Sequence, residues 1–191
     1  MARALVLGLG NILLRDEGVG VRVVEALAER YVLPAGVEVV DGGTCGMDLL
    51  DTLAGCEHLL VCDAVRTGAA PGSVVKLSGD QVPALFQVRY SPHQLGLMDV
   101  LATLTLTGEA PATLTLVGIV PADLRLGLEL SPVVAEAAEQ AVEALAAALR
   151  GLGFTLTSWS QALCSPSPLF LPVEENEECR AAFPNPLKLN P

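Results

Sequence analysis

The stretch that decides the fold is the first one, which reads Leu5-Val6-Leu7-Gly8-Leu9-Gly10-Asn11-Ile12-Leu13-Leu14-Arg15-Asp16-Glu17-Gly18-Val19-Gly20. Its opening apolar run is short enough for a buried strand, and the run breaks at two glycines that let the chain turn sharply and pack closely. Two adjacent carboxylates, Asp16 and Glu17, follow before a helical pattern begins. Acids beside so much apolar chain need a partner or a ligand. The stretch therefore predicts a buried strand, a loop that carries a site, and a helix.

Beyond this stretch, strand-like and helix-like patterns alternate along the chain. Strands are expected at residues 4–7, 37–40, 58–62, 72–77 and 113–120, and helices at 19–31, at 46–54, from Ser91-Pro92 onward, and at 131–149. Strands that alternate with helices form mostly parallel sheets with helices on both faces. A chain of 191 residues suffices for one well-packed domain and is short for two. The sequence thus predicts a single α/β domain.

The end of the chain differs in composition from the rest. Residues 155–191 hold six of the thirteen prolines, an acidic cluster at 174–178 and little periodicity. Such a composition favours a surface segment without a packed core. We therefore expect a folded domain at residues 1–154 and a proline-rich acidic tail at residues 155–191 that is poorly ordered and contributes little to the core.

Composition excludes several classes of function. A formal charge of −11 makes nucleic acid an unsuitable partner, since phosphate contacts need Lys and Arg. No apolar run reaches the roughly 18 residues of a membrane span, and the N-terminus lacks the pattern of a cleavable signal peptide. Five cysteines without a C-x-x-C spacing fit reduced thiols better than disulfides or a zinc cluster. We expect a cytoplasmic protein that binds neither nucleic acid nor membrane.

Acidic residues follow three of the predicted strands: Glu17 follows the first, Asp41 the second and Asp63 the third. The carboxyl ends of parallel strands meet at one edge of a sheet, and a helix that begins near His93 returns to that edge. Glu17, Asp63 and His93 are therefore expected to converge. Two carboxylates and one imidazole suit a divalent metal ion with open coordination positions. A helix N-terminus also disfavours the imidazolium form of His93, which keeps a nitrogen lone pair available.

Each of these residues also has an ordinary structural interpretation. His93 could simply line a helix start, Asp63 could cap a helix, and Asp41 could close a turn. Asp16 could pair with a neighbouring arginine such as Arg15 or Arg22.

Other chemistries find weaker support in the sequence. The turn Gly8-Leu9-Gly10 resembles part of a dinucleotide fingerprint, but Leu13 stands where the third glycine belongs. Cys45 could act as a nucleophile with His93 as its base. The chain contains no G-x-S-x-G elbow, which excludes a serine hydrolase of that type.

Six short blocks resemble, in the same order, the motifs of the hydrogenase maturation endopeptidases, which remove a C-terminal extension from the large subunit of nickel–iron hydrogenases. The blocks are the opening Gly8–Gly20, Asp41-Gly42-Gly43-Thr44, Cys62-Asp63-Ala64, Ser91-Pro92-His93-Gln94, Gly118-Ile119-Val120-Pro121 and Gly127-Leu128-Glu129-Leu130-Ser131-Pro132. Together they span residues 3 to about 150, which makes the resemblance specific.

The resemblance implies a three-layer α/β/α fold around a five-stranded mixed sheet with one antiparallel strand. It also implies that Glu17, Asp63 and His93 recognise nickel already present in the large-subunit precursor. The nickel would thus be a transient ion brought by the substrate, and other divalent ions such as Zn²⁺ or Cd²⁺ would be able to occupy the site in vitro.

The chemistry of the cut is left open by the sequence. A metal-polarised water, a carboxylate base at Asp16 or Asp41, or direct polarisation of the scissile carbonyl would each fit. Two alternative functions are a nucleotide-binding module that uses the Gly8-Leu9-Gly10 turn, and a non-catalytic nickel chaperone that uses Glu17, Asp63 and His93.

Overall fold

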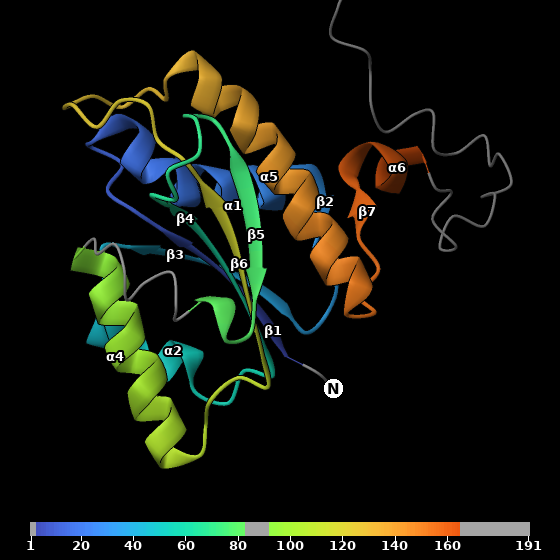
Figure 1. The fold of residues 1–191 in the computed structure, drawn as a ribbon. Coiled ribbons are helices and arrows are strands. Elements are labelled where there is room, and N and C mark those ends of the chain that lie inside the picture. Colours follow the sequence, from blue (N-terminus) through green and yellow to red (C-terminus); the bar gives the residue numbers. More distant parts are fainter. Residues whose placement is uncertain (1–2, 83–91, 165–191) are drawn as a thin grey trace, which may run out of the picture.

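The computed structural model describes residues 3–82 and 92–164, and within these ranges the side chains of residues 92–95 and 162–164 are left undescribed. Figure 1 shows one twisted sheet with helices on both of its faces. The predicted three-layer α/β/α arrangement is therefore confirmed.

The sheet contains five strands, which are β1 (Ala4–Leu9), β3 (Val37–Gly43), β4 (His58–Ala64), β5 (Val74–Ser78) and β6 (Thr113–Ile119). Their order across the sheet is β3-β1-β4-β6-β5. The first four are parallel, and β5 runs antiparallel to β6 at one edge. The buried apolar runs predicted as strands form these strands, and the sheet is mixed and mostly parallel, as predicted.

One face of the sheet is covered by α1 (Val19–Arg30) and α5 (Pro132–Gly151). Both helices place a stripe of small and branched apolar residues on the sheet, with Val24, Leu27, Val134 and Leu145 fully or almost fully buried. The predicted helical periodicity of both segments is confirmed. Within the described ranges, no helix combines the length and apolar character that crossing a membrane requires.

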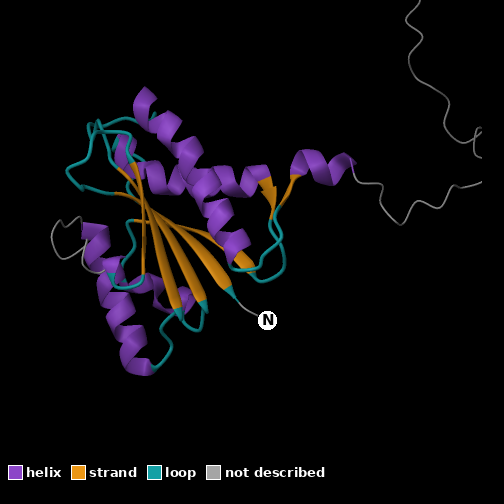
Figure 2. Cartoon of the chain, turned by 45° about the vertical axis from the view of Figure 1, so that its right-hand side comes forward, coloured by secondary structure: helices purple, strands orange, loops and turns teal. Residues whose placement is uncertain are grey.

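The other face is covered by α4 (Pro92–Thr107), the short 3-10 turn η2 (Met47–Leu49) and α2 (Leu50–Leu53). Figures 1 and 2 show α4 and α2 on the side of the sheet opposite α5. The predicted apolar stripe of α4 is confirmed, since Leu97, Leu101 and Leu104 are buried. The helix expected at residues 46–54 consists of η2 followed by α2.

The start of the predicted tail belongs to the fold. Residues 157–158 form β7, which pairs antiparallel with β2 (Tyr31–Val32), and Trp159–Cys164 form α6. Leu156 is only 8% exposed and packs in the core under α1 and α5. The segment was expected to contribute little to the core; backbone pairing with β2 and the buried Leu156 attach its first residues to the domain. Residues 165–191 lie outside the described residues.

Candidate functional site

Glu17 lies in a 3-10 turn, η1 (Arg15–Gly18), between β1 and α1. The loop after β1 folds back against this turn: a Cβ placed on Gly10 would lie 1.7 Å from the carbonyl oxygen of Glu17. Gly10 also has φ of 124°, a conformation that side chains disfavour. Both observations require glycine at position 10, which lets the loop after β1 fold back onto η1 and hold Glu17 at the carboxyl edge of the sheet.

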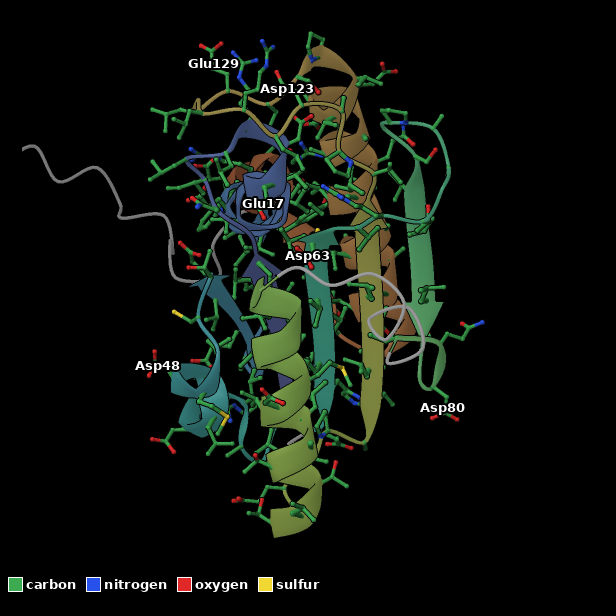
Figure 3. The ribbon with its side chains drawn as sticks, turned by 60° about the vertical axis from the view of Figure 1, so that its left-hand side comes forward. Glu17, Asp48, Asp63, Asp80, Asp123 and Glu129 are labelled. Carbon is green, nitrogen blue, oxygen red and sulfur yellow. The ribbon has the colours of Figure 1, made fainter. Side chains whose placement is uncertain are left out.

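Asp63 comes from the neighbouring strand β4, where it pairs in register with Gly118 of β6. It is fully buried and stands one residue before the end of β4. In Figure 3, Glu17 and Asp63 lie at the same end of the sheet, where the ribbon of α4 begins. The predicted convergence of these two carboxylates at one sheet edge is therefore present.

The first turn of α4 contains His93, whose side chain lies outside the described residues. The position of the helix is fixed at Gly96, because a Cβ there would lie 2.6 Å from the Cα of Gly46. Two glycine backbones thus touch, and the start of α4 rests on the loop that follows β3. The backbone of His93 is accordingly at the edge that carries Glu17 and Asp63.

Asp16 is fully buried and its carboxylate accepts four hydrogen bonds. The backbone amides of Ala122 and Asp123 donate to Oδ2 over 2.9 and 2.7 Å. Ser131 donates its amide to Oδ1 over 2.7 Å and its hydroxyl to Oδ2 over 2.8 Å. These donors all come from the loop between β6 and α5. A carboxylate so occupied joins two loops, and its geometry speaks against the predicted role of catalytic base.

Neither Arg15 nor Arg22 forms the ion pair with Asp16 that the sequence suggested. The guanidinium of Arg15 pairs with Asp123 over 3.1 Å, and that of Arg22 pairs with Glu25. Ser131 precedes the first residue of α5, but its hydroxyl donates to Asp16 and does not cap the helix. A buried carboxylate has the stronger need for donors, because its charge is removed from water.

Asp41 and Cys45 lie on the strand end and loop next to β1. Asp41 is exposed, pairs in register with Gly8, and accepts a 2.8 Å hydrogen bond from the amide of Gly43. This contact closes an Asx turn. Cys45 is exposed in the loop that meets α4 at Gly96. Both residues are therefore accessible, and the loop of Cys45 lies against α4.

The second histidine, His58, lies at the opposite end of the strands, away from Glu17 and Asp63. His58 begins β4, and its Nδ1 lies 2.9 Å from the hydroxyl of Thr113. Among the side chains that the structure describes, no three His, Cys, Asp or Glu residues are grouped as a metal site. The trio of Glu17, Asp63 and His93 stays a prediction, since its third side chain is not among them.

A hollow of about 350 Å³ opens at the carboxyl ends of β4 and β6. It lies between the loop after β4 and the loop after β6, and its lining is Arg66, Thr67, Gly68, Ala69, Val120, Pro121, Ala122 and Leu124. Arg66 follows Asp63 by three residues. The carboxyl edge thus carries the buried Asp63, the half-buried Glu17 and a hollow between two of its loops.

In α/β proteins, ligands bind outside the carboxyl ends of the parallel strands. The acidic residues and the hollow found there place this chain in that class, with its site at this edge. The chain belongs to the hydrogenase maturation protease family, because the HycI family model, described as hydrogenase maturation protease, matches residues 21–148. It is therefore an enzyme that hydrolyses peptide bonds.

Individual relatives agree with this assignment. The hydrogenase 2 maturation protease of Escherichia coli strain K12 is 53% identical over 152 residues, which cover 79% of this chain and 93% of that protein. The structure of the hydrogenase maturating endopeptidase HybD from E. coli is similar with a TM-score of 0.80 and 52% identity, covering 83% of this chain and 98% of HybD. The structure of the [NiFe] hydrogenase maturation protease HybD from Thermococcus kodakarensis is similar with a TM-score of 0.64 and 32% identity. The match covers 75% of this chain and 96% of that protein.

Sequence reasoning missed the partners of Asp16. Neither Ser131 nor Asp123 was linked to Asp16, although both lie in the loop that Asp16 holds. A signal was present, since acids close to so much apolar chain need a partner. Their position more than a hundred residues further along the chain was not encoded in any local pattern.

Proposed function

We propose that this protein is the endopeptidase that removes the C-terminal extension from the large-subunit precursor of a nickel–iron hydrogenase, in the cytoplasm and after nickel insertion. Nickel reaches the site with the substrate, where Glu17, Asp63 and the imidazole of His93 recognise it. The observation that carries the proposal is the meeting of Glu17, Asp63 and the first turn of α4 at one sheet edge in a member of the hydrogenase maturation protease family.

The donor set fits an ion that is shared with the substrate. Two carboxylates and one imidazole leave positions open, so that groups of the precursor complete the coordination shell. An open three-ligand site also retains a metal ion less firmly than a closed four-ligand site. The protein would be isolated largely free of metal, although Zn²⁺ or Cd²⁺ added in vitro would bind.

Of the two carboxylates considered as a base, Asp41 is the better candidate. Its side chain is exposed at the end of β3, whereas that of Asp16 is enclosed and accepts four hydrogen bonds. A base must reach the water or group that it deprotonates. Asp41→Asn should therefore reduce cleavage if a carboxylate base is used, and leave it unchanged if the metal ion alone polarises water or the carbonyl.

The alternatives lose support. The turn Gly8-Leu9-Gly10 packs against the carbonyl of Glu17 within the same chain, which is not the arrangement of a nucleotide cradle. Membership in a family of proteases argues against a non-catalytic nickel chaperone. A thiol nucleophile at Cys45 makes one distinct prediction, the loss of all cleavage in Cys45→Ala, whereas metal recognition by carboxylates and imidazole predicts that this variant stays active.

The decisive experiment incubates the purified protein with large-subunit precursor, either loaded with nickel or free of it, and follows the loss of the extension by mass spectrometry. We expect cleavage of the nickel-loaded precursor alone. His93→Ala should fold with an unchanged circular dichroism spectrum and fail to cleave. His58→Ala is the matched control, because His58 lies at the opposite edge of the sheet, and it should cleave normally. Equal cleavage of nickel-free precursor would overturn the proposal.

A further inference from the structure

Two loops at the carboxyl edge present large apolar side chains to solvent. We call this set the leucine platform; its members are Ile12, Leu13, Leu124, Leu126 and Leu128. Leu126 is 81% exposed, Leu128 60% and Leu13 56%. Of the nine large hydrophobic side chains that are exposed within the described residues, five belong to this set. Apolar side chains gathered in this way mark an interaction site, whereas single exposed ones do not.

The platform is held in place by its backbone. The amide of Gly127 donates to the carbonyl of Leu13 over 2.9 Å, and the amide of Arg15 donates to the carbonyl of Gly127 over 2.9 Å. The buried Asp16 ties the same two loops together from below. The leucines are thus exposed on an ordered base, which cannot turn them inward without breaking buried hydrogen bonds.

The two arginines of the platform loops are both paired with an acid. Asp123 accepts from Arg15 over 3.1 Å and from Arg125 over 2.7 Å, and the hydrogen bonds from Arg125 hold the pKa of the Asp123 carboxyl below its usual range. With Asp16, Glu17 and Glu129, the loop pair carries two arginines and four acids, of which Asp16 is buried. Because both arginines are paired with Asp123, the feature that this surface offers a partner is its exposed apolar side chains, which fit an apolar face.

The platform continues into the site. Leu13 precedes Glu17 by four residues in the loop that forms η1, and Leu124 also lines the hollow between the loops that follow β4 and β6. In Figure 3, Glu17 lies between the loop that carries Asp123 and Glu129 and the end of the strand that carries Asp63. A protein that brings a metal centre to Glu17 and Asp63 must therefore cover this surface.

We propose that the leucine platform is the docking surface for the protein substrate, and that it contacts an apolar face of the precursor beside its metal centre. This inference rests on the proposed function for the identity of the substrate. The platform would select a folded partner by its surface, whereas the metal ligands would report on its nickel. Binding and nickel recognition would then be separable by mutation.

The test compares Leu126→Ser/Leu128→Ser with the matched control Leu106→Ser. Leu106 is 89% exposed near the end of α4, at the opposite edge of the sheet. We expect the double variant to raise KM for nickel-loaded precursor by roughly tenfold or more, with kcat within about twofold, because truncated central contacts weaken binding by that order. Leu106→Ser should leave both constants unchanged. An unchanged KM in a folded double variant would overturn the docking surface.

A cross-linking experiment keeps the two proposals distinguishable and does not depend on how the double variant folds. A photoreactive residue is placed at position 126 or, as control, at position 106 of the otherwise unaltered chain. Capture of precursor from position 126 alone supports docking even if no cleavage occurs, in which case the proposed function fails and the surface stands. Capture of a second copy of this chain, or equal capture of precursor from both positions, would overturn the docking surface.

Discussion

Asp16 and Glu17 are neighbours in the sequence but lie in different environments. Asp16 is completely enclosed and its two oxygens bind the β6–α5 loop, whereas Glu17 is only partly buried at the sheet edge. The difference arises because both residues lie in the 3-10 turn η1. With three residues per turn, successive side chains point about a third of a turn apart. The same turn therefore supplies a structural anchor and a candidate metal ligand.

Asp16→Ala should lower the free energy of unfolding by roughly 3–5 kcal/mol, because it leaves buried donors of the β6–α5 loop without an acceptor. Asp41→Ala is the matched control: it removes an exposed carboxylate with one turn hydrogen bond and should cost no more than about 1 kcal/mol. Urea unfolding monitored by circular dichroism measures both. Similar losses in the two variants would refute the structural role assigned to Asp16.

The cysteines should differ in reactivity. Cys45 is exposed, while Cys56 and Cys62 are buried, and burial raises the pKa of both buried thiols. Because the thiolate is the reactive form, brief treatment of the native protein with iodoacetamide should modify Cys45 and spare the other two. Peptide mapping by mass spectrometry identifies the modified residues, and treatment in denaturant provides the control. Rapid alkylation of Cys62 in the native protein would contradict its buried placement.

The helix α4 contributes to the site through its position. Its buried stripe contains Leu97, Leu101 and Leu104, which fix its rotation, but the distance of its first turn from the β3 loop is set where Gly96 meets Gly46. A helix that starts at a sheet edge can thus be moved by a single methyl group near that start. We expect this contact to matter more for activity than for folding.

Gly96→Ala should lower kcat/KM for the precursor by roughly 10- to 100-fold, since a displacement of about 1 Å at a site has effects of that order. Gly151→Ala at the end of α5 is the matched control: a Cβ there would contact nothing within 4 Å. That variant should gain up to about 1 kcal/mol in stability and keep its activity. Equal activity in the two variants would show that the glycine contact does not position α4.

At the scale of the whole molecule, the folded unit extends past the last long helix. Phe154 and Leu156 pack beneath α1 and α5, the ring of Phe154 meets His58 edge-on, and β7 pairs with β2. These contacts attach the segment after α5 to both the helical layer and the start of the sheet. The boundary expected at residue 154 therefore divides a packed region.

Two truncations test this extension of the fold. A chain ending at Gly153 should melt roughly 5–10 °C below a chain ending at Cys164, because it loses the burial of Leu156 and the β2–β7 pairing. The comparison isolates residues 154–164, since both chains lack everything after Cys164. Melting is followed by circular dichroism at 222 nm or by calorimetry. Equal melting temperatures would mean that the segment rests on the domain without stabilising it.

The sequence by itself determined the α/β alternation and the sheet edge at which Glu17 and Asp63 meet. Both follow from local information: apolar runs of strand length, helical stripes such as that of Leu97 and Leu101, and the rule that parallel strands end together. The family resemblance implied one antiparallel strand without saying which, and the structure identifies it as β5; a short apolar strand carries the same sequence pattern in either direction.

Only the tertiary structure decided where the polar groups find their partners. Asp16 and Ser131 are 115 positions apart, Arg15 and Asp123 are 108 apart, and β2 meets β7 across almost the whole described chain. Local propensity contains no term for such distant pairs, because their energy exists only once the sheet and both helical layers have brought the loops together. The buried anchor at Asp16, the exposed leucines above it and the attachment of residues 156–164 were therefore decided by the tertiary structure.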